Sequence, residues 1–134
     1  MADRTFPADI SALNEVLLFT EEQLEQAGCP AKSVMQITVA IEEMFVNVAH
    51  YAYPGRECTV RYSIEPGDNS VTFRMADSGV PFDPLAKPDP DITLSADERQ
   101  IGGLGIFMMK KTMDEVSYTY ENGENILTMT KRFK

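Results

Sequence analysis

Residues 58–75 read CTVRYSIEPGDNSVTFRM, and this stretch decides the fold. Apolar and polar side chains alternate on both sides of a turn at residues 66–69, which is the period expected of strands with one buried face. The apolar positions are Cys58, Val60, Tyr62 and Ile64 before the turn and Val71, Phe73 and Met75 after it. Two such strands joined by a short turn predict an antiparallel hairpin whose apolar face needs a covering layer.

Two helical segments precede this hairpin and can supply that layer. The first is predicted to start from a cap at Asp9 or Ser11 and to run to about residue 27, because Gly28 is suited to a left-handed helix end. Its apolar positions are Leu13, Val16, Leu17, Leu24 and Ala27. The second is predicted to carry Pro30 in its first turn and to stop at residues 54–55, a Pro-Gly pair. Its apolar positions are Val34, Ile37, Ile41, Phe45 (or Met44) and Val48.

The remaining segments complete a two-layer arrangement. Residues 5–8 read as a short extended segment, residues 78–101 as a long Pro-rich loop, and residues 103–113 as a third helix. Strands at 116–120 and 126–133 flank an Asn122–Gly123 turn. This order predicts an α+β fold, a two-layer α/β sandwich whose helices cover one face of a mainly antiparallel mixed sheet. We expect residues 1–134 to form a single domain.

Composition excludes several classes of partner. The net charge of −9 argues against non-specific nucleic-acid binding and against a polybasic membrane anchor. No apolar run approaches the roughly 20 residues of a membrane span. Cys29 and Cys58 lie far apart in no metal-like spacing and are interpreted as reduced thiols of a cytoplasmic protein. An anionic ligand held by backbone amides and a metal ion remains compatible with this charge.

Glu43 and Asn47 stand four residues apart in the second helical segment, so their side chains share a helical face. An Asn amide oxygen can bind a hard cation such as Mg²⁺, and a carboxylate one turn away can accept a proton from water or a hydroxyl. The alternative is a solvated pair with no function. The neighbouring Glu42 lies on a different face and is interpreted as solvated.

Asp77 follows the second strand of the hairpin and precedes Ser78 and Gly79. A carboxylate at the end of a strand can accept a hydrogen bond from an exocyclic amine, and Gly79 would let a flat ring approach the backbone. The alternative is a turn that the Asp77 side chain stabilises by itself.

Gly102, Gly103 and Gly105 precede the third predicted helix. Backbone N–H groups at a helix N-terminus attract anions, and glycines allow a phosphate to come close. The segment is neither a Walker loop nor a dinucleotide-binding fingerprint, since it lacks the surrounding residues and elements of both.

These three segments, in this order, resemble the motifs of the GHKL (Bergerat-fold) ATPases. Within that superfamily the chain is most similar to the small anti-sigma-factor serine kinases of bacterial partner-switching systems. Residues 41–50 resemble the family's N-box, residues 77–84 its first glycine box and residues 102–114 its second. The resemblance covers nearly the whole chain and implies the histidine-kinase-like ATPase fold.

The resemblance also implies roles for the residues. Glu43 would be the general base, Asn47 would bind Mg²⁺, and Asp77 would contact the amine of adenine with Gly79 beneath the ring. The nucleotide would be ATP, its phosphates held by Gly102, Gly103 and Gly105, with residues 84–101 as a short lid.

Other parts of the motif pattern leave roles open. The histidine that relatives carry four residues after the Asn falls one residue early here, at His50, which favours a structural role. Arg99 is a candidate phosphate contact, and Thr128 and Thr130 are two candidates for a threonine that contacts adenine.

The activity implied is transfer of the γ-phosphoryl group of ATP to a serine of a STAS-domain anti-anti-sigma protein, with a sigma factor as second partner and a homodimer as the common state. A non-catalytic binding module gated by ATP and ADP is the alternative, and a protein that binds no nucleotide is a third hypothesis.

Overall fold

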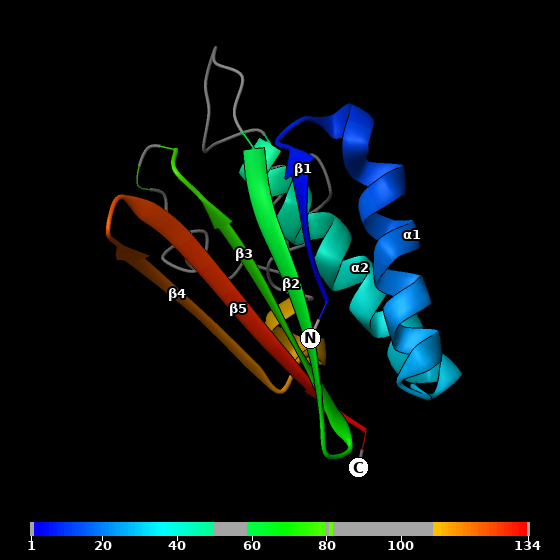
Figure 1. The fold of residues 1–134 in the computed structure, drawn as a ribbon. Coiled ribbons are helices and arrows are strands. Elements are labelled where there is room, and N and C mark those ends of the chain that lie inside the picture. The colour runs from blue at the N-terminus through cyan, green and yellow to red at the C-terminus, as the bar shows by residue number, and fades with distance from the viewer. Residues whose placement is uncertain (1, 50–58, 80, 82–108, 134) are drawn as a thin grey trace, which may run out of the picture.

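Helices cover one face of a sheet in the computed structural model, which describes residues 2–49, 59–79, 81 and 109–133 (Figure 1). Its elements are strand β1 (Ala2–Pro7), the 3-10 turn η1 (Ile10–Ala12), helix α1 (Leu13–Gln26), helix α2 (Ala31–Asn47) and strands β2 (Thr59–Gly67), β3 (Ser70–Asp77), β4 (Glu115–Glu121) and β5 (Glu124–Arg132). A further helical turn lies at residues 109–112.

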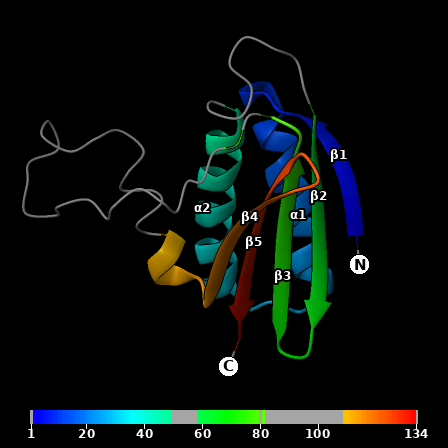
Figure 2. The same cartoon turned by 90° about the vertical axis from the view of Figure 1, so that its left-hand side faces the viewer.

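The described strands form one sheet in the order β1-β2-β3-β5-β4, and every neighbouring pair is antiparallel. A view turned by 90° shows α1 and α2 on the same side of this sheet (Figure 2). The predicted α+β sandwich with an antiparallel sheet is therefore confirmed. Within the described residues, none of the helices is long and apolar enough to cross a membrane.

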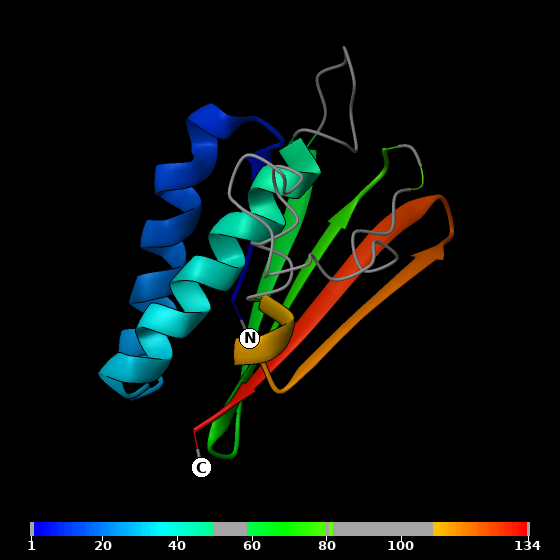
Figure 3. The ribbon, with the colours of Figure 1, turned by 180° about the vertical axis from the view of Figure 1, so that it is seen from behind.

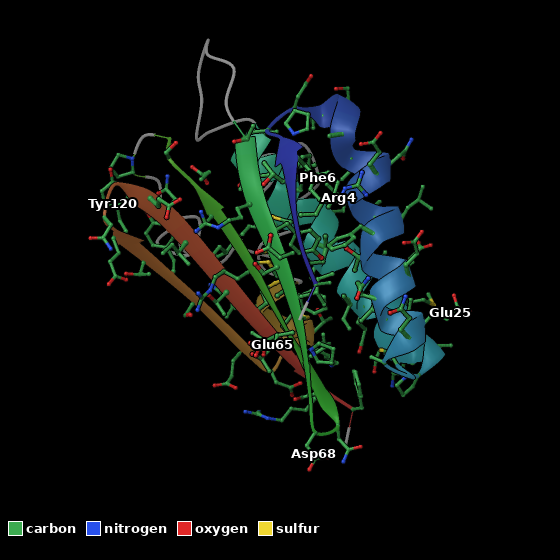
Figure 4. All side chains as sticks on the ribbon, in the orientation of Figure 1. Arg4, Phe6, Glu25, Glu65, Asp68 and Tyr120 are labelled. Carbon is green, nitrogen blue, oxygen red and sulfur yellow. The ribbon has the colours of Figure 1, made fainter. Side chains whose placement is uncertain are left out.

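The N-terminal segment forms a full edge strand where the sequence indicated only a short extended segment. β1 pairs with β2 in a register that places Phe6 opposite Val60. Phe6 is 1% exposed, and the guanidinium of Arg4 lies 4.8 Å from the centroid of its ring (Figure 4). The partner strand is so distant along the chain that no local pattern could have indicated this pairing.

Both hairpin turns fall where the sequence predicts them. The β2–β3 turn is shorter than the predicted turn at residues 66–69, because β2 extends to Gly67 and β3 begins at Ser70. In this turn Asn69 has a φ of 54°. In the β4–β5 turn, φ is 53° at Asn122 and 79° at Gly123. Two positive φ values in a row are those of the type I′ turn, which matches the twist of antiparallel strands.

The prediction that Asp9 or Ser11 caps the first helix is wrong. α1 begins at Leu13 after the 3-10 turn, and no side chain caps its N-terminus. Ser11 Oγ instead donates to Asp9 Oδ2 at 2.8 Å, and the N–H of Ala12 donates to the backbone oxygen of Asp9 at 2.9 Å. The backbone of the short turn thus takes the place of a side-chain cap.

The boundary between the two helices is close to the prediction. Gly28, with a φ of 72°, follows the end of α1, as expected of a left-handed helix end. Pro30 stands immediately before α2 rather than in its first turn. α2 ends at Asn47 and continues as a π-type turn at residues 48–49, and the predicted stop at residues 54–55 lies outside the described residues.

The core lies between the sheet and the two helices. Its fully buried side chains come from the inner faces of β2 and β3 and from one face of α2, and include Val60, Tyr62, Ile64, Val71, Phe73, Ile37, Ile41, Met44 and Phe45. These are the alternating and helically spaced apolar positions of the sequence, and both Met44 and Phe45 are buried. Their burial fixes which face of α2 meets the sheet.

The buried face of α1 is rotated from the predicted one. Leu13, Leu17 and Ala27 are only half-buried, whereas Phe19 is 9% exposed and Thr20 is fully buried. The rotation lets Phe19 pack with Phe6 and Tyr62, whose ring centroids lie 5.9 and 5.6 Å from its own. The prediction overlooked this because it counted aliphatic residues alone.

A hydrogen bond inside the core joins α1 to β2. Thr20 Oγ1 donates to the backbone oxygen of Val16 at 2.8 Å and lies 2.6 Å from the hydroxyl of Tyr62. Because the single proton of Thr20 is used on Val16, Tyr62 must be the donor to Thr20. Burial raises the pKa of Tyr62, so this phenol stays protonated in the folded state.

Thr20→Val should destabilise the fold by about 1–3 kcal/mol, because it leaves the buried Tyr62 hydroxyl without its acceptor. The double variant Thr20→Val with Tyr62→Phe should recover part of that loss, since no polar group is then left unpaired. Urea unfolding of the three variants and the wild type measures both effects. Equal stability of the Thr20→Val variant and the wild type would contradict this.

The same burial predicts how stability changes at alkaline pH. Since the pKa of Tyr62 is raised in the folded state, the free energy of unfolding should fall as pH rises above about 10, where the unfolded phenol ionises. The Tyr62→Phe variant should show a shallower fall over the same range. Chemical unfolding at several pH values between 8 and 11 tests this, and identical slopes would exclude it.

Candidate functional site

Glu43 and Asn47 project from the last turns of α2 and are joined by a hydrogen bond. Asn47 Nδ2 lies 3.0 Å from Glu43 Oε1 and 2.7 Å from the backbone oxygen of Glu43. Asn47 is 6% exposed and Glu43 is half-buried, whereas the neighbouring Glu42 is exposed, as expected. The two predicted residues thus form one contact at the border of the core rather than a solvated pair.

The orientation of the Asn47 amide follows from its two partners. A carbonyl oxygen and an ionised carboxylate only accept hydrogen bonds, so the amide nitrogen must face them. The amide oxygen Oδ1 therefore points away from Glu43. Mg²⁺ commonly takes one or two protein oxygens and fills its other positions with water and phosphate. The amide oxygen of Asn47 therefore fits the role of one such protein oxygen for a magnesium ion.

Asp77 is the last residue of β3 and is 3% exposed. Its Oδ1 accepts a hydrogen bond from the N–H of Gly79 at 3.0 Å, which is the self-stabilised turn that the sequence offered as an alternative. The same oxygen also accepts from Nδ2 of Asn125 at 3.0 Å. The buried carboxylate of Asp77 therefore stabilises its own turn and also joins β3 to β5 through Asn125.

Asn125 and Tyr118 belong to this site and were missed by the sequence analysis. Asn125 is 6% exposed, lies directly opposite Asp77 in the β3–β5 register, and accepts a hydrogen bond at Oδ1 from the Tyr118 hydroxyl. A signal was present in the last strand. Asn125 alternates with Leu127 and Met129, so it had to share their buried face.

Thr128 and Thr130 lie on the opposite face of β5 from Asn125. Thr130 Oγ1 lies 3.1 Å from Thr72 Oγ1 across the outer, uncovered face of the sheet, and Thr128 pairs with Arg74, which is exposed. The hypothesis that either threonine contacts adenine beside Asp77 is therefore wrong for this structure, because strand alternation points both hydroxyls away from the helices.

The two parts of the candidate site lie at the same end of the molecule. The C-terminal end of α2, the end of β3 and the β4–β5 turn lie there in both the front and the rear views (Figures 1 and 3). Glu43 and Asn47 come from the helical layer, and Asp77, Gly79 and Asn125 come from the sheet. The fold thus brings residues from separate motifs to one end of the sandwich.

Several predicted residues lie outside the described part of the chain. These are Gly102, Gly103, Gly105, His50, Arg99, Cys58 and the segment 84–101. Of the two cysteines, Cys29 is a half-buried free thiol after the end of α1. Burial raises the pKa of this thiol above its usual value, and the positive charge of Lys131 offsets only part of that rise.

Comparison with known proteins gives a consistent result. The model of the family described as "Histidine kinase-like ATPase domain" matches residues 6–131. The chain is 30% identical over 95 residues to the serine/threonine-protein kinase BtrW of Bordetella bronchiseptica, and the aligned region covers 70% of this chain and 67% of that protein. It is 29% identical over 113 residues to the serine-protein kinase RsbW of Listeria monocytogenes, covering 79% of this chain and 70% of the relative.

Solved structures with this fold include a two-domain structure and a histidine kinase. The RsbU and RsbW domains of Rv1364c from Mycobacterium tuberculosis match with a TM-score of 0.65 at 19% identity, over 98% of this chain and 32% of that one. The Acinetobacter baumannii histidine kinase AdeS matches with a TM-score of 0.51 at 15% identity, over 100% of this chain and 68% of that one. With a family match over residues 6–131, an antiparallel sheet under two helices, and a buried Asn and Asp at one end, the chain belongs to the histidine kinase-like ATPase family.

Proposed function

We propose that this chain is an ATP- and Mg²⁺-dependent protein serine/threonine kinase of the anti-sigma type, which phosphorylates a STAS-domain anti-anti-sigma protein. Membership of the histidine kinase-like ATPase family supports nucleotide binding, and the similarity to named serine kinases supports transfer to a protein hydroxyl. The observation that carries the proposal is the Glu43–Asn47 contact. It supports the proposal because a carboxylate that can accept a proton lies next to an amide that can bind a metal ion.

In this proposal the two ends of ATP are held by different layers of the sandwich. Asp77 accepts a hydrogen bond from the exocyclic amine of adenine, and Gly79 lets the ring approach the backbone. Asn47 holds Mg²⁺ through its amide oxygen, and Gly102, Gly103 and Gly105 offer backbone N–H groups to the phosphates. The protein carries a net charge of −9, so the metal and the backbone amides must supply the positive field.

The chemical step needs few side chains. A serine Oγ of the protein substrate forms a bond to the γ-phosphorus of ATP, while the bond from that phosphorus to the bridging oxygen breaks and ADP leaves. Glu43 accepts the proton of the serine hydroxyl, and its hydrogen bond to Asn47 keeps the carboxylate beside the metal ligand. Bound Mg²⁺ would neutralise charge on the phosphates.

The proposal includes two further partners. A sigma factor would be the second protein that this chain binds, and a homodimer would be its oligomeric form. Neither a nucleic acid nor a membrane surface is part of the proposal.

Glu43→Gln should keep nucleotide binding and lose phosphotransfer. The Gln side chain still accepts a hydrogen bond from Asn47 but cannot take a proton at neutral pH, so the transfer rate should fall roughly 100- to 10,000-fold. Single-turnover phosphotransfer and nucleotide titration measure the two effects separately. Glu42→Gln, one residue away and exposed, is the matched control and should behave like the wild type. Phosphotransfer by the Glu43→Gln variant at the wild-type rate would refute the role of Glu43 as base.

Asn47→Ala should remove the effect of Mg²⁺ on nucleotide affinity, because it deletes the amide oxygen that binds the metal. ATP affinity of this variant should be the same with Mg²⁺ as with a chelator, whereas the wild type should bind more tightly with Mg²⁺. Isothermal titration under both conditions checks this, with Asn14→Ala on the exposed side of α1 as control. A Mg²⁺ effect of wild-type size in the Asn47→Ala variant would rule out the metal role.

The substrate is sought directly with γ-labelled ATP, Mg²⁺ and a lysate of the source organism. A small protein labelled by the wild type but not by the Glu43→Gln variant would support the kinase and identify its substrate. Nucleotide binding with no labelled protein would favour the alternative, a binding module gated by ATP and ADP. A thermal scan in which no adenine nucleotide raises the melting temperature would exclude both.

A further inference from the structure

Three side chains from three neighbouring strands form a continuous series of hydrogen bonds on the inner face of the sheet. Tyr118 of β4 contacts Asn125 of β5, and Asn125 contacts Asp77 of β3 at 3.0 Å. Asn125 Nδ2 also lies 3.5 Å from the backbone oxygen of Gly79. Asp77 and Asn125 are 3% and 6% exposed, so water hardly competes for these contacts.

The direction of each hydrogen bond follows from the ionised carboxylate of Asp77, which can only accept. The amide atom of Asn125 that contacts it must therefore be the nitrogen, and the amide oxygen must face Tyr118. The hydroxyl of Tyr118 is then the donor to that oxygen. Tyr118 thus fixes the amide, and the amide in turn donates to Asp77.

The two donors to Asp77 meet at the same oxygen atom. The N–H of Gly79 and Nδ2 of Asn125 each lie 3.0 Å from Oδ1. One donor comes from the turn after β3 and the other from the neighbouring strand, so they hold the carboxylate against rotation about its Cβ–Cγ bond. Fixing the position of Oδ1 also fixes the direction in which Oδ2 points.

We propose that Asn125, oriented by Tyr118, is a positioning residue that aims the carboxylate of Asp77 at the exocyclic amine of the purine and thereby sets a preference for 6-amino purines. This inference rests on the proposed nucleotide site and names its specificity. A carboxylate oxygen attracts the 6-amino group of adenine and repels the 6-carbonyl oxygen of guanine or hypoxanthine. A purine with hydrogen at position 6 makes neither contact.

The strength of this preference depends on alignment. Polar sites built to hydrogen-bond one substrate group reject analogues that lack it, because a buried partner is then left unpaired. A carboxylate free to rotate would turn away from the amine position and bind the two kinds of purine more equally. The ratio of affinities for amino and non-amino purines therefore measures the alignment of Asp77.

The test compares Mg²⁺-ATP with the Mg²⁺ complex of purine riboside triphosphate, which lacks only the 6-amino group. The wild type should bind ATP roughly 10- to 100-fold more tightly, as expected for one hydrogen bond to a charged group. Asn125→Leu and Asn125→Ser should lower this ratio to within about 3-fold, mainly through weaker ATP binding. Thr128→Val, on the outer face of the same strand, is the matched control and should keep the wild-type ratio.

Tyr118→Phe tests the orienting donor without disturbing the strand. It removes one hydroxyl, so the oxygen of the Asn125 amide loses the hydrogen bond from Tyr118 while the contacts of the amide nitrogen remain. The ratio should therefore fall to an intermediate value. Tyr120→Phe is the control, because Tyr120 lies two residues further along β4 and is 45% exposed at the sheet edge (Figure 4).

Each outcome of this experiment distinguishes the inference from the function on which it rests. A reduced ratio in folded Asn125 and Tyr118 variants supports the positioning role, because a general loss of structure would weaken both nucleotides equally. An unchanged ratio in the Asn125 variants overturns the inference but leaves the nucleotide site standing. A wild type that binds neither nucleotide contradicts the proposed function itself and the inference with it.

Discussion

The register of β3 against β5 is the constraint on which the site depends. It sets Asp77 directly opposite Asn125 and Met75 opposite Leu127, so that a polar pair at the end of the strands is followed by apolar packing. Side chains alternate with a period of two, so a shift by one residue would move Asn125 to the outer face of the sheet. The apolar inner faces of both strands oppose such a shift, because it would expose them to water.

The helical layer adds a second constraint of the same kind. Burial of Ile37, Ile41, Met44 and Phe45 against the sheet leaves little freedom for α2 to rotate about its axis. Glu43 and Asn47 then lie at the border of the buried face, where one can be enclosed and the other half-exposed. The chemistry proposed for this pair needs both conditions, since a metal ligand gains from enclosure and a proton acceptor must be reached by its substrate.

Local pattern was enough to predict the hairpins and the two helices, and with them that Glu43 and Asn47 share a helical face and that Asp77 stands at the end of a strand. The features that the sequence analysis did not predict depend on contacts between distant parts of the chain. Pairing of β1, burial of Thr20 against Tyr62, and the Asn125–Asp77 contact all join elements that local periodicity treats separately. The alternation of β5 puts Asn125 and the two threonines on opposite faces, a signal that the sequence analysis did not use, and only the register against β3 shows that Asn125 meets Asp77.

The pairing of β3 with β5, where the two hairpins meet, also bears on how the chain folds. β2–β3 and β4–β5 each close through a short turn, whereas β3 and β5 meet only when segments far apart in sequence dock. Forming such contacts first costs the chain entropy of closing a long loop, so they tend to form late in folding. The residues proposed to read the purine lie where the two hairpins meet, so under the proposed function a chain whose hairpins had formed but not docked would lack the purine site. Nucleotide would then bind only chains that have completed the sheet, and its binding would favour the docked state.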